Sequence, residues 1–549
     1  HKTMPNIQVR ILGEIGAVPD ASPWDLPNNG FDIAINARFD EGKVKRSIAF
    51  KSLGTTTTAN VGRFIIGGTQ ASGFDRIIVA STDYNLYEYT PSANSYTSKL
   101  SGGGSYNSNE QYTGIVFDSG FYITRPDRVP QYLALSSGGN FGDLANWDAN
   151  ERCRIIRSFN SFLIALNITK NTTSHPTMVK WSDLKVDGSN PSWDETNASL
   201  LAGENTIADM PTEIVDGRQL RNSFYIYSRN QVWRMEYVGG SDIFTFNKVF
   251  DKTGLINTNC VVEVEGKHYC FGLDDIYVHD GTTKQTIADE RVRNFIYNGI
   301  NTSDNSGEVS KSFFVTYNGV SKEVLFCYTS GDAFVPTDLN ATARCNRAAV
   351  YNIVNNTWAF IDLPNVSSAT SASLNLSVAT YNNTSLTYNN GGFTYASQDA
   401  QDFIRRAIFV TEPHGSSTHN VKEIAVLDNV DSGSIAKPAS TRVLNTTIAR
   451  RNQIDLDEQG IPLSGYKNIR NIYPQATITT GSLTFNFGAN DTPTNTFSTS
   501  LSKSFTPTTD YKIDTRLAGR YLNYEIRETN GKDFSVSGFD MDVLTTGRR

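Results

Sequence analysis

Apolar and polar positions alternate most clearly between Asn222 and Gly240, in NSFYIYSRNQVWRMEYVGG. Aromatic and β-branched residues flank a short polar SRN, which predicts two strands joined by a tight connection. In the second strand Trp233, Met235 and Tyr237 share one face, since successive side chains of a strand point to opposite sides. We expect this face to pack between neighbouring strand pairs, because aromatic strand faces are usually core.

Similar strand pairs recur along the chain at intervals of roughly 35 to 65 residues, close to the ~40–50 residues of a propeller blade. They lie at 75–92, 112–133, 157–170, 266–283, 322–364 and 402–428. A lone hairpin cannot bury its apolar face, whereas blades packed around an axis bury those faces against each other. The pattern therefore predicts an all-β fold with a degenerate β-propeller over residues 47–430. Two stacked β-sandwich domains are the rival interpretation.

The two ends of the chain have different patterns. Residues 1–46 are rich in turn signals, which predicts an extended N-terminal arm with little regular sheet that wraps other elements. Asp431 to Arg442 is small, polar and Pro-containing, as in a linker. Beyond it, period-two alternation predicts a C-terminal β-sandwich-like domain over residues 431–549. Asn530-Gly531 predicts a hairpin turn between its last two strands.

Composition narrows the classes of function. The 549 residues are 38% hydrophobic and 19% charged, which argues against disorder. The net charge is −7, and there is no run of Lys and Arg of the kind that grips nucleic-acid phosphates. No apolar run is long enough to span a bilayer, and the start of the chain lacks the pattern of a secretory signal.

The cysteines predict neither a disulfide framework nor a zinc site, because their number is odd and no Cys-x-x-Cys occurs. They are Cys153, Cys260, Cys270, Cys327 and Cys345. Cys260 and Cys270 flank VVEVEGKHY and could lie opposite each other in a hairpin. We expect them to be small buried residues with free thiols.

Candidate metal chemistry is sparse. His279 lies in DDIYVHD among Asp274, Asp275 and Asp280, and a solvated strand end beside a turn is favoured over a metal site. DLDEQG, from Asp455 to Gly460, imitates the start of a calcium loop but lacks the required later ligands. We therefore predict no metal and no cofactor.

No catalytic motif stands out either. The chain has no nucleophile elbow, and the stretch from Trp181 to Trp193 imitates a sialidase Asp-box only with the wrong spacing. We predict no catalytic residues and a protein that is not an enzyme.

The order of short motifs resembles tail nozzle proteins of short-tailed bacteriophages, also called tail tubular protein B, which are similar to packaged-DNA stabilisation hub proteins. Members commonly open with N-x-R-F-x-x-G followed by a basic pair, here Asn36, Arg38, Phe39 and Gly42. RSFNSFLIAL, VKWSDL, PSW, the hairpin that begins at Asn222, and DKTGLINTNCVVEVEGKHYCFGLDDIYVHDG then follow in the family's order. LAGRYLNYEIRETNGKDFSVSGFDMDV is similar to its closing domain.

The resemblance implies a structural virion protein, assembled in the host cytoplasm. Such proteins form a homo-hexameric tube beneath a twelve-fold adaptor ring and act as a conduit and gate for genome retention and ejection. Genomic DNA passes through the lumen without sequence-specific binding, and the tail tip meets the host envelope during infection. Attachment of tail fibres stays open, because the chain is shorter than nozzles that carry an added platform domain.

Charge adds an expectation about the lumen. Six copies would carry a formal charge of −42, six times −7. An acidic or neutral lumen would let DNA slide rather than stick.

Two alternatives come from other classes. A carbohydrate-binding or glycosidase-like propeller would need convergent carboxylates and exposed aromatics in an axial pocket. An extracellular interaction module would need a signal peptide upstream of His1.

Overall fold

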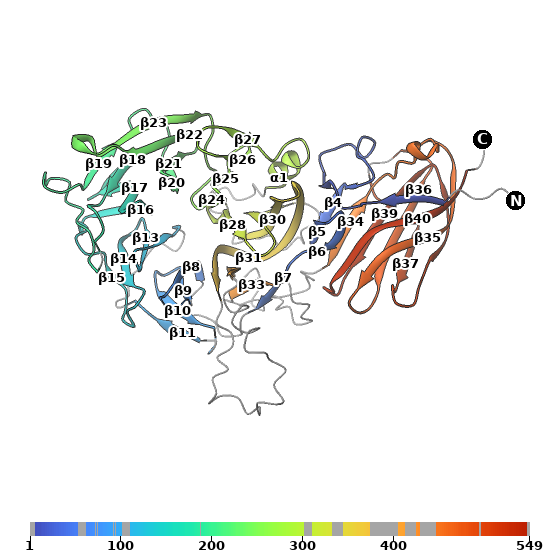
Figure 1. Cartoon of the computed structure of the whole chain (residues 1–549), viewed down its shortest axis with the longest axis horizontal. Coiled ribbons are helices and arrows are strands. Elements are labelled where there is room, and N and C mark those ends of the chain that lie inside the picture. The colour runs from blue at the N-terminus through green and yellow to red at the C-terminus, as the bar shows by residue number, and fades with distance from the viewer. Residues whose placement is uncertain are drawn as a thin grey trace, which may run out of the picture.

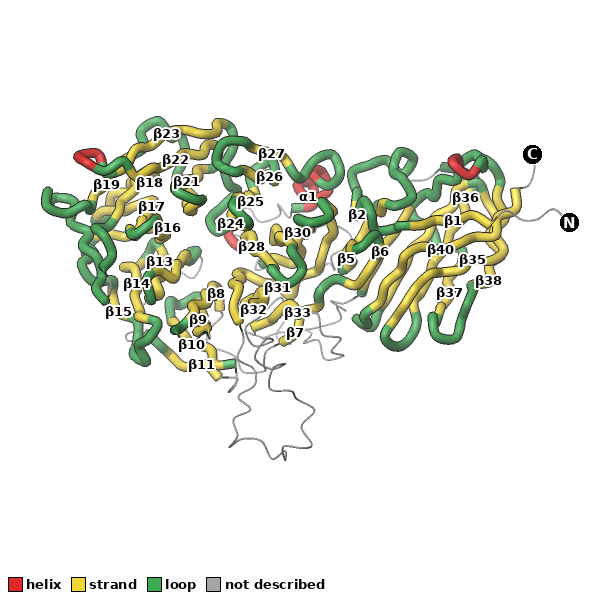
Figure 2. Tube along the Cα trace, viewed as in Figure 1, coloured by secondary structure: helices red, strands yellow, loops and turns green. Residues whose placement is uncertain are grey.

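The computed structural model describes residues 6–52, 62–71, 73, 75–91, 93, 95–100, 110–186, 188–300, 310–331, 344–373, 405–411, 424–428, 446–493 and 496–545. These residues are mostly in strands (Figure 2). Among them α1 (Arg293–Gly299) is the single α-helix, and η1 (Gly240–Asp242), η2 (Ser310–Ser312) and η3 (Asp457–Gln459) are short 3-10 helices. A ring of sheets lies beside a second stack of strands that contains the first and the last described strands, β1 (Asn6–Arg10) and β40 (Phe534–Thr545) (Figure 1). No helix in the described part is long and apolar enough to cross a membrane.

Five four-stranded antiparallel sheets follow one another along the chain, and we number them blades 1 to 5. The first strand of each lies against the first strand of the next, so the first strands line the axis of the ring. The strands are β8 (Gly62–Thr69), β9 (Asp75–Ser81), β10 (Leu86–Thr90) and β11 (Ser95–Ser98) in blade 1; β12 (Thr113–Phe117), β13 (Gly120–Arg125), β14 (Arg128–Ala134) and β15 (Gly142–Asp143) in blade 2; β16 (Glu151–Phe159), β17 (Phe162–Lys170), β18 (Thr173–Trp181) and β19 (Gly203–Thr206) in blade 3; β20 (Ile214–Leu220), β21 (Ser223–Ser228), β22 (Gln231–Tyr237) and β23 (Phe244–Asp251) in blade 4; and β24 (Val261–Val264), β25 (Lys267–Phe271), β26 (Ile276–His279) and β27 (Lys284–Thr286) in blade 5.

Blades 6 and 7 share one long strand, β31 (Thr357–Ser373). Its first half pairs with β30 (Cys345–Asn352) and completes blade 6 with β28 (Phe314–Asn318) and β29 (Glu323–Tyr328). Its second half pairs with β32 (Arg405–Thr411), followed by β33 (Ile424–Asp428). β7 (Ala49–Ser52), from far earlier in the chain, pairs with β33 as the outer strand of blade 7. The described strands thus form a seven-bladed propeller, which confirms the predicted fold class.

The second body is a β-sandwich. One layer has the order β38 (Ile513–Gly519), β35 (Lys467–Ile478), β40 (Phe534–Thr545), β6 (Lys43–Arg46), β5 (Ala37–Asp40), with β1 (Asn6–Arg10) also paired to β40. The other runs β4 (Ile33–Ile35), β34 (Thr447–Arg451), β39 (Tyr521–Glu528), β36 (Leu483–Asn490), β37 (Leu501–Phe505). Aromatic rings fill the space between the layers, and Tyr524 meets Phe539 edge-on at 5.0 Å.

The N-terminal segment differs from its prediction. Besides β1, β4, β5 and β6 it contributes β2 (Gly16–Ala17) and β3 (Gly30–Phe31), so the expectation of little regular sheet was wrong. Short alternating runs such as NIQVR suffice to form strands here, because the sandwich supplies a ready partner in β40 and buries Ile7 and Val9. The domain limits at 46/47 and 430/431 stay predictions, and the predicted linker lies entirely outside the described residues.

A second difference concerns the last two strands. β39 and β40 do not pair with each other as the predicted hairpin would; they belong to different layers of the sandwich. Gly531 has a φ of 69°, as a tight turn needs, and the Glu528 carboxylate accepts backbone N–H bonds from Asn530 (2.8 Å) and Lys532 (2.9 Å). The turn reverses the direction of the chain, but the strand that follows it lies in the other layer of the sandwich rather than in the same sheet.

Candidate functional site

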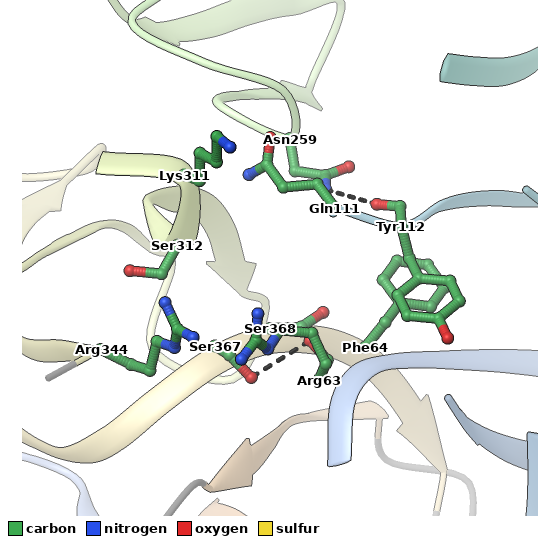
Figure 3. Close-up of a pocket in the computed structure, with 10 residues that line it drawn as sticks. All are labelled: Arg63, Phe64, Gln111, Tyr112, Asn259, Lys311, Ser312, Arg344, Ser367 and Ser368. Atoms are coloured by element: carbon green, nitrogen blue, oxygen red, sulfur yellow. Dashed lines mark hydrogen bonds between the residues drawn. The ribbon is translucent and has the colours of Figure 1, made fainter. Parts of the chain in front are cut away.

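A small pocket opens at the axis of the propeller, where residues from blades 1, 2, 5, 6 and 7 converge (Figure 3). It is lined by Arg63, Phe64, Gln111, Tyr112, Asn259, Lys311, Ser312, Arg344, Ser367 and Ser368. Three of these side chains are cationic, and none of the ten is a carboxylate. Its cavity volume is about 20 Å³, so it can hold one or two water molecules or a small ion but is too small for a sugar ring.

Next to the pocket, a buried ion pair ties the inner strands together. Arg157 of blade 3 holds Asp216 of blade 4 through two hydrogen bonds, Nε to Oδ1 at 3.0 Å and Nη2 to Oδ2 at 3.1 Å. Arg157 also donates to the Asn259 side chain at 3.0 Å and to the carbonyl of Gly114 at 3.0 Å. The Asn259 amide N–H donates to Asp216 at 2.8 Å, and its side chain donates to the carbonyl of Tyr112 at 3.0 Å. Side chains of blades 3, 4 and 5 and backbone of blade 2 are thereby joined at the axis.

A second polar cluster lies between blades 4 and 5. The Tyr227 hydroxyl of β21 is 2.6 Å from Nδ1 of His268 in β25 and 2.6 Å from Nε2 of His279 in β26. His268 Nε2 is 3.0 Å from the carbonyl of Gln219, and the backbone N–H of Gly281 donates to His279 Nδ1 at 3.1 Å. All four imidazole nitrogens therefore have partners. The cluster is buried, because Tyr227, His268 and His279 are each at most 1% exposed.

Burial governs the titration of this cluster. It lowers the pKa of His279 to about 4, with a small opposing effect of Asp280. Burial and the neighbouring His279 hold the pKa of His268 well below its usual value. Burial likewise raises the pKa of the Tyr227 hydroxyl far above its usual value. Both histidines are consequently neutral at physiological pH.

The interpretation of His279 as a solvated strand end was wrong, since its ring is buried against Tyr227. The neighbouring aspartates behave as turn residues. Asp280 accepts from the backbone N–H groups of Thr282 and Thr283, and these bonds lower its pKa. The Asp275 carboxylate accepts from the Thr286 hydroxyl at 2.7 Å. Within the described ranges no group of three metal-ligating side chains gathers.

The calcium-like stretch from Asp455 to Gly460 lies beside a buried ammonium group. Lys467 donates to the carbonyls of Leu463 (2.6 Å), Gly465 (2.9 Å) and Arg520 (2.6 Å). Burial lowers the pKa of Lys467 to about 8, against the opposing effect of Asp457 and Asp455. The carbonyls of this corner thus hold a lysine of the chain itself.

The hairpin that begins at Asn222 is β21 and β22 of blade 4. Trp233 and Met235 are buried between blades 3 and 4, as predicted, but Tyr237 at the end of the same face is 50% exposed. Trp193 of the Asp-box-like stretch packs edge-on against Trp147 at 4.8 Å. All five cysteines are free and buried, and Cys270 pairs in register with Val261, next to Cys260. The predicted burial of Trp233 and Met235 and the predicted buried free thiols are confirmed, whereas the packing of Tyr237 and the placing of Cys260 opposite Cys270 were wrong.

Sequence reasoning missed the two polar networks. Arg157, Asp216 and Asn259 belong to three blades, and Tyr227 is 41 residues from His268. The available signal was the placement of charged residues, such as Arg157 and Asp216, beside apolar residues in strands of the propeller, where both side chains are buried.

Comparison with known proteins leaves the chain without an assigned family. No family model matches it, and no curated protein matches it. Among solved structures, the WD40 β-propeller domain of Doa1 is 8% identical, with a TM-score of 0.39 over 70% of this chain and 98% of that one. The computationally designed Ika8 protein is 7% identical, with a TM-score of 0.35 over 69% of this chain and 99% of that one.

Proposed function

We propose that this protein is a structural, non-enzymatic subunit of a phage virion, and that six copies form the nozzle of a short tail beneath an adaptor ring. The proposal rests on the order of the sequence motifs from Pro5 to Val543. In this role the assembly is a conduit and gate that retains the genome and releases it into the host.

The position of the N-terminal segment carries the structural support. The segment with the N-x-R-F-x-x-G motif supplies strands to the sandwich and, through β7, the closing strand of the propeller. Between them, the Asp20 carboxylate accepts from the backbone N–H groups of Asn294 (2.6 Å) and Phe295 (2.8 Å) in α1. Asp32 pairs with the buried Arg451 of β34 at 3.3 Å. These contacts fix the N-terminal segment to both the propeller and the sandwich. We expect such a rigid connection in a subunit that forms part of a tube wall.

The axial pocket favours this proposal over the carbohydrate-binding or glycosidase-like alternative. Glycosidases place two carboxylates on either side of the bond that they cleave. The ten residues that line this pocket supply three cations and no carboxylate, and the space is too small for a sugar ring.

The predicted acidic or neutral lumen would be formed by the six subunits together. The formal charge of −7 per chain supports a lumen along which DNA slides.

Electron microscopy of the phage particle, with an antibody raised against this chain as a label, tests the proposal. We expect the label on a six-fold ring at the tail tip. Label on the capsid, or a tail tip without six-fold symmetry, would contradict it. In parallel, native mass spectrometry of the purified chain should give a monomer or a hexamer, since ring contacts join two different patches. A stable dimer would count against the nozzle.

A further inference from the structure

The hydrogen bonds around Tyr227 run in one direction only. The backbone N–H of Gly281 can only donate, so His279 Nδ1 accepts and its proton is on Nε2. The carbonyl of Gln219 can only accept, so His268 donates from Nε2 and its Nδ1 is unprotonated. His279 therefore donates to the Tyr227 oxygen, and the Tyr227 hydroxyl donates to His268 Nδ1. Tyr227, His268 and His279 therefore each donate one hydrogen bond and accept another within this chain of contacts.

An added proton has no acceptor in this arrangement. On His279 it would go to Nδ1, which faces the N–H of Gly281. On His268 it would go to Nδ1, which faces the hydroxyl proton of Tyr227. Either event sets two donors against each other in a buried site, where an unmet polar group is costly.

The other charged and titratable groups around the cluster offer little relief. From blade 4, the Tyr225 ring lies 5.3 Å from His279, and Arg218 disfavours a charge on His268. From blade 5, the Cys270 thiol and the ring of Tyr277 face the cluster, and Lys284 is a further nearby cation. Glu263 of β24 is the register partner of His268, but it is exposed and its carboxylate accepts the backbone N–H of Gly266. Asp280 is the one described carboxylate that favours a charged His279, and its Oδ1 already accepts three hydrogen bonds from Thr282 and Thr283 in the turn that follows.

We propose that the seam between blades 4 and 5 is an acid-sensitive latch, in which protonation of His268 or His279 breaks the one-way chain through Tyr227 and opens the seam locally. The inference concerns the propeller itself and does not depend on the nozzle function. Opening would expose the Cys270 thiol, whose sulfur lies 3.9 Å from the Tyr227 oxygen.

The direction and the pH window follow from the two histidines. Their pKa is lower in the closed seam than in the open one, so closure is favoured above the ordinary value of 6.5 and weakens as the pH falls. For His279 the loss extends down to about pH 4. Between pH 7 and pH 5 this residue alone should raise the equilibrium constant for opening about 20-fold, and His268 adds to that effect.

Thiol labelling of the full chain tests the latch. The probe is a dipyridyl disulfide that reacts with thiols in mild acid, and peptide mass spectrometry reads Cys270 and Cys153 separately. Cys153 is a buried free thiol in blade 3, outside the seam. Each labelling rate is divided by the rate for the same cysteine in denatured protein at the same pH, which removes the reactivity of the thiol itself. We expect the ratio for Cys270 to rise at least about 20-fold from pH 7 to pH 5, while that for Cys153 stays within about twofold.

Variants assign the effect to the two rings. His268→Gln with His279→Gln keeps one donor and one acceptor at each position but removes the titration, so the response of Cys270 to acid should disappear. His279→Gln alone should lose only part of it, which keeps the test decisive if the double variant does not fold. His175→Gln, on the outer part of blade 3, should respond like the unchanged protein. An equal rise at Cys153 and Cys270, no rise at either, or a full response in the His279→Gln variant would overturn the latch.

Discussion

The two faces of blade 4 hold their neighbours by different physical means, although one strand serves both. In β21, Phe224 and Ile226 point toward blade 3 and join a cluster of buried apolar side chains there. Tyr225 and Tyr227 alternate with them and point toward blade 5, where Tyr227 meets two histidines. The first seam depends mainly on filled volume, with the Arg157–Asp216 ion pair at its inner end, whereas the second adds a chain of hydrogen bonds through two histidines to its apolar contacts. No histidine lies in the first cluster, so mild acid should affect the second seam more strongly.

The largest effect should come from emptying the apolar seam. Trp233 is 8% exposed, and Trp233→Ala should lower the free energy of unfolding by about 3–5 kcal/mol through lost burial and the cavity left behind. The loss should be the same at pH 7 and pH 5, because no titrating group is involved. Denaturant unfolding followed at both pH values measures it. A variant with unchanged stability would return Trp233 to the surface and reopen a binding role for this strand.

An effect of similar size is expected at the axis, where both seams meet. Arg157→Ala leaves the buried Asp216 carboxylate without its bidentate partner, which should cost about 3–5 kcal/mol. Arg154→Ala is the matched control, since Arg154 is on the same strand with its guanidinium 3.9 Å from Glu110 and its side chain 30% exposed. Thermal and denaturant unfolding should show at most about 1 kcal/mol for the control. Equal losses in the two variants would contradict a special role for the axial pair.

The polar seam should respond more weakly to Tyr227→Phe. Removing the hydroxyl leaves His268 Nδ1 without a donor and His279 Nε2 without an acceptor, at a cost of about 1–3 kcal/mol. Denaturant unfolding at pH 7 gives the value. The variant should also expose Cys270 to thiol reagents at neutral pH, whereas Trp233→Ala should not. Exposure of Cys270 in Trp233→Ala but not in Tyr227→Phe would refute the assignment of the two seams.

The smallest effect is expected at Tyr237, at the end of the strand that carries Trp233. Its side chain is half exposed and touches the rings of Phe162 and Phe244. Tyr237→Ala should therefore cost less than about 1 kcal/mol, as surface substitutions usually do. Unfolding in denaturant beside Trp233→Ala checks the contrast. A cost as large as that of Trp233→Ala would mean that the apolar seam reaches farther outward than the burial of Tyr237 indicates.

Local alternation predicted the blades well, because each hairpin is close in sequence and its core face repeats every second residue. Trp233 and Met235 were identified as core in this way. Pairings between distant segments were beyond that reasoning. β7 reaches blade 7 across most of the chain, and β31 serves two blades, so neither has a local signature. The Asn530-Gly531 turn was recognised, but whether it joins one sheet or two depends on partners contributed by β34 and β35.

The polar sites were the least predictable part. Asp280, His279 and Asp275 looked alike as residues of an acidic turn, yet the fold leaves Asp280 partly exposed and buries the ring of His279. The difference arises because His279 is the last residue of β26 and faces blade 4, whereas Asp280 lies past the end of the strand, in the turn that follows. Only the arrangement of the blades decides which polar residue needs a buried partner.

Hydrogen exchange of the unaltered protein at pH 7 and pH 5, read by peptide mass spectrometry and corrected for intrinsic exchange rates, tests the contrast between the two seams most directly. We predict that the amides of β25 and β26 lose protection at pH 5, while those of β16 and β17 in blade 3 keep theirs. Equal loss of protection in all four strands, or unchanged protection in β25 and β26, would contradict it.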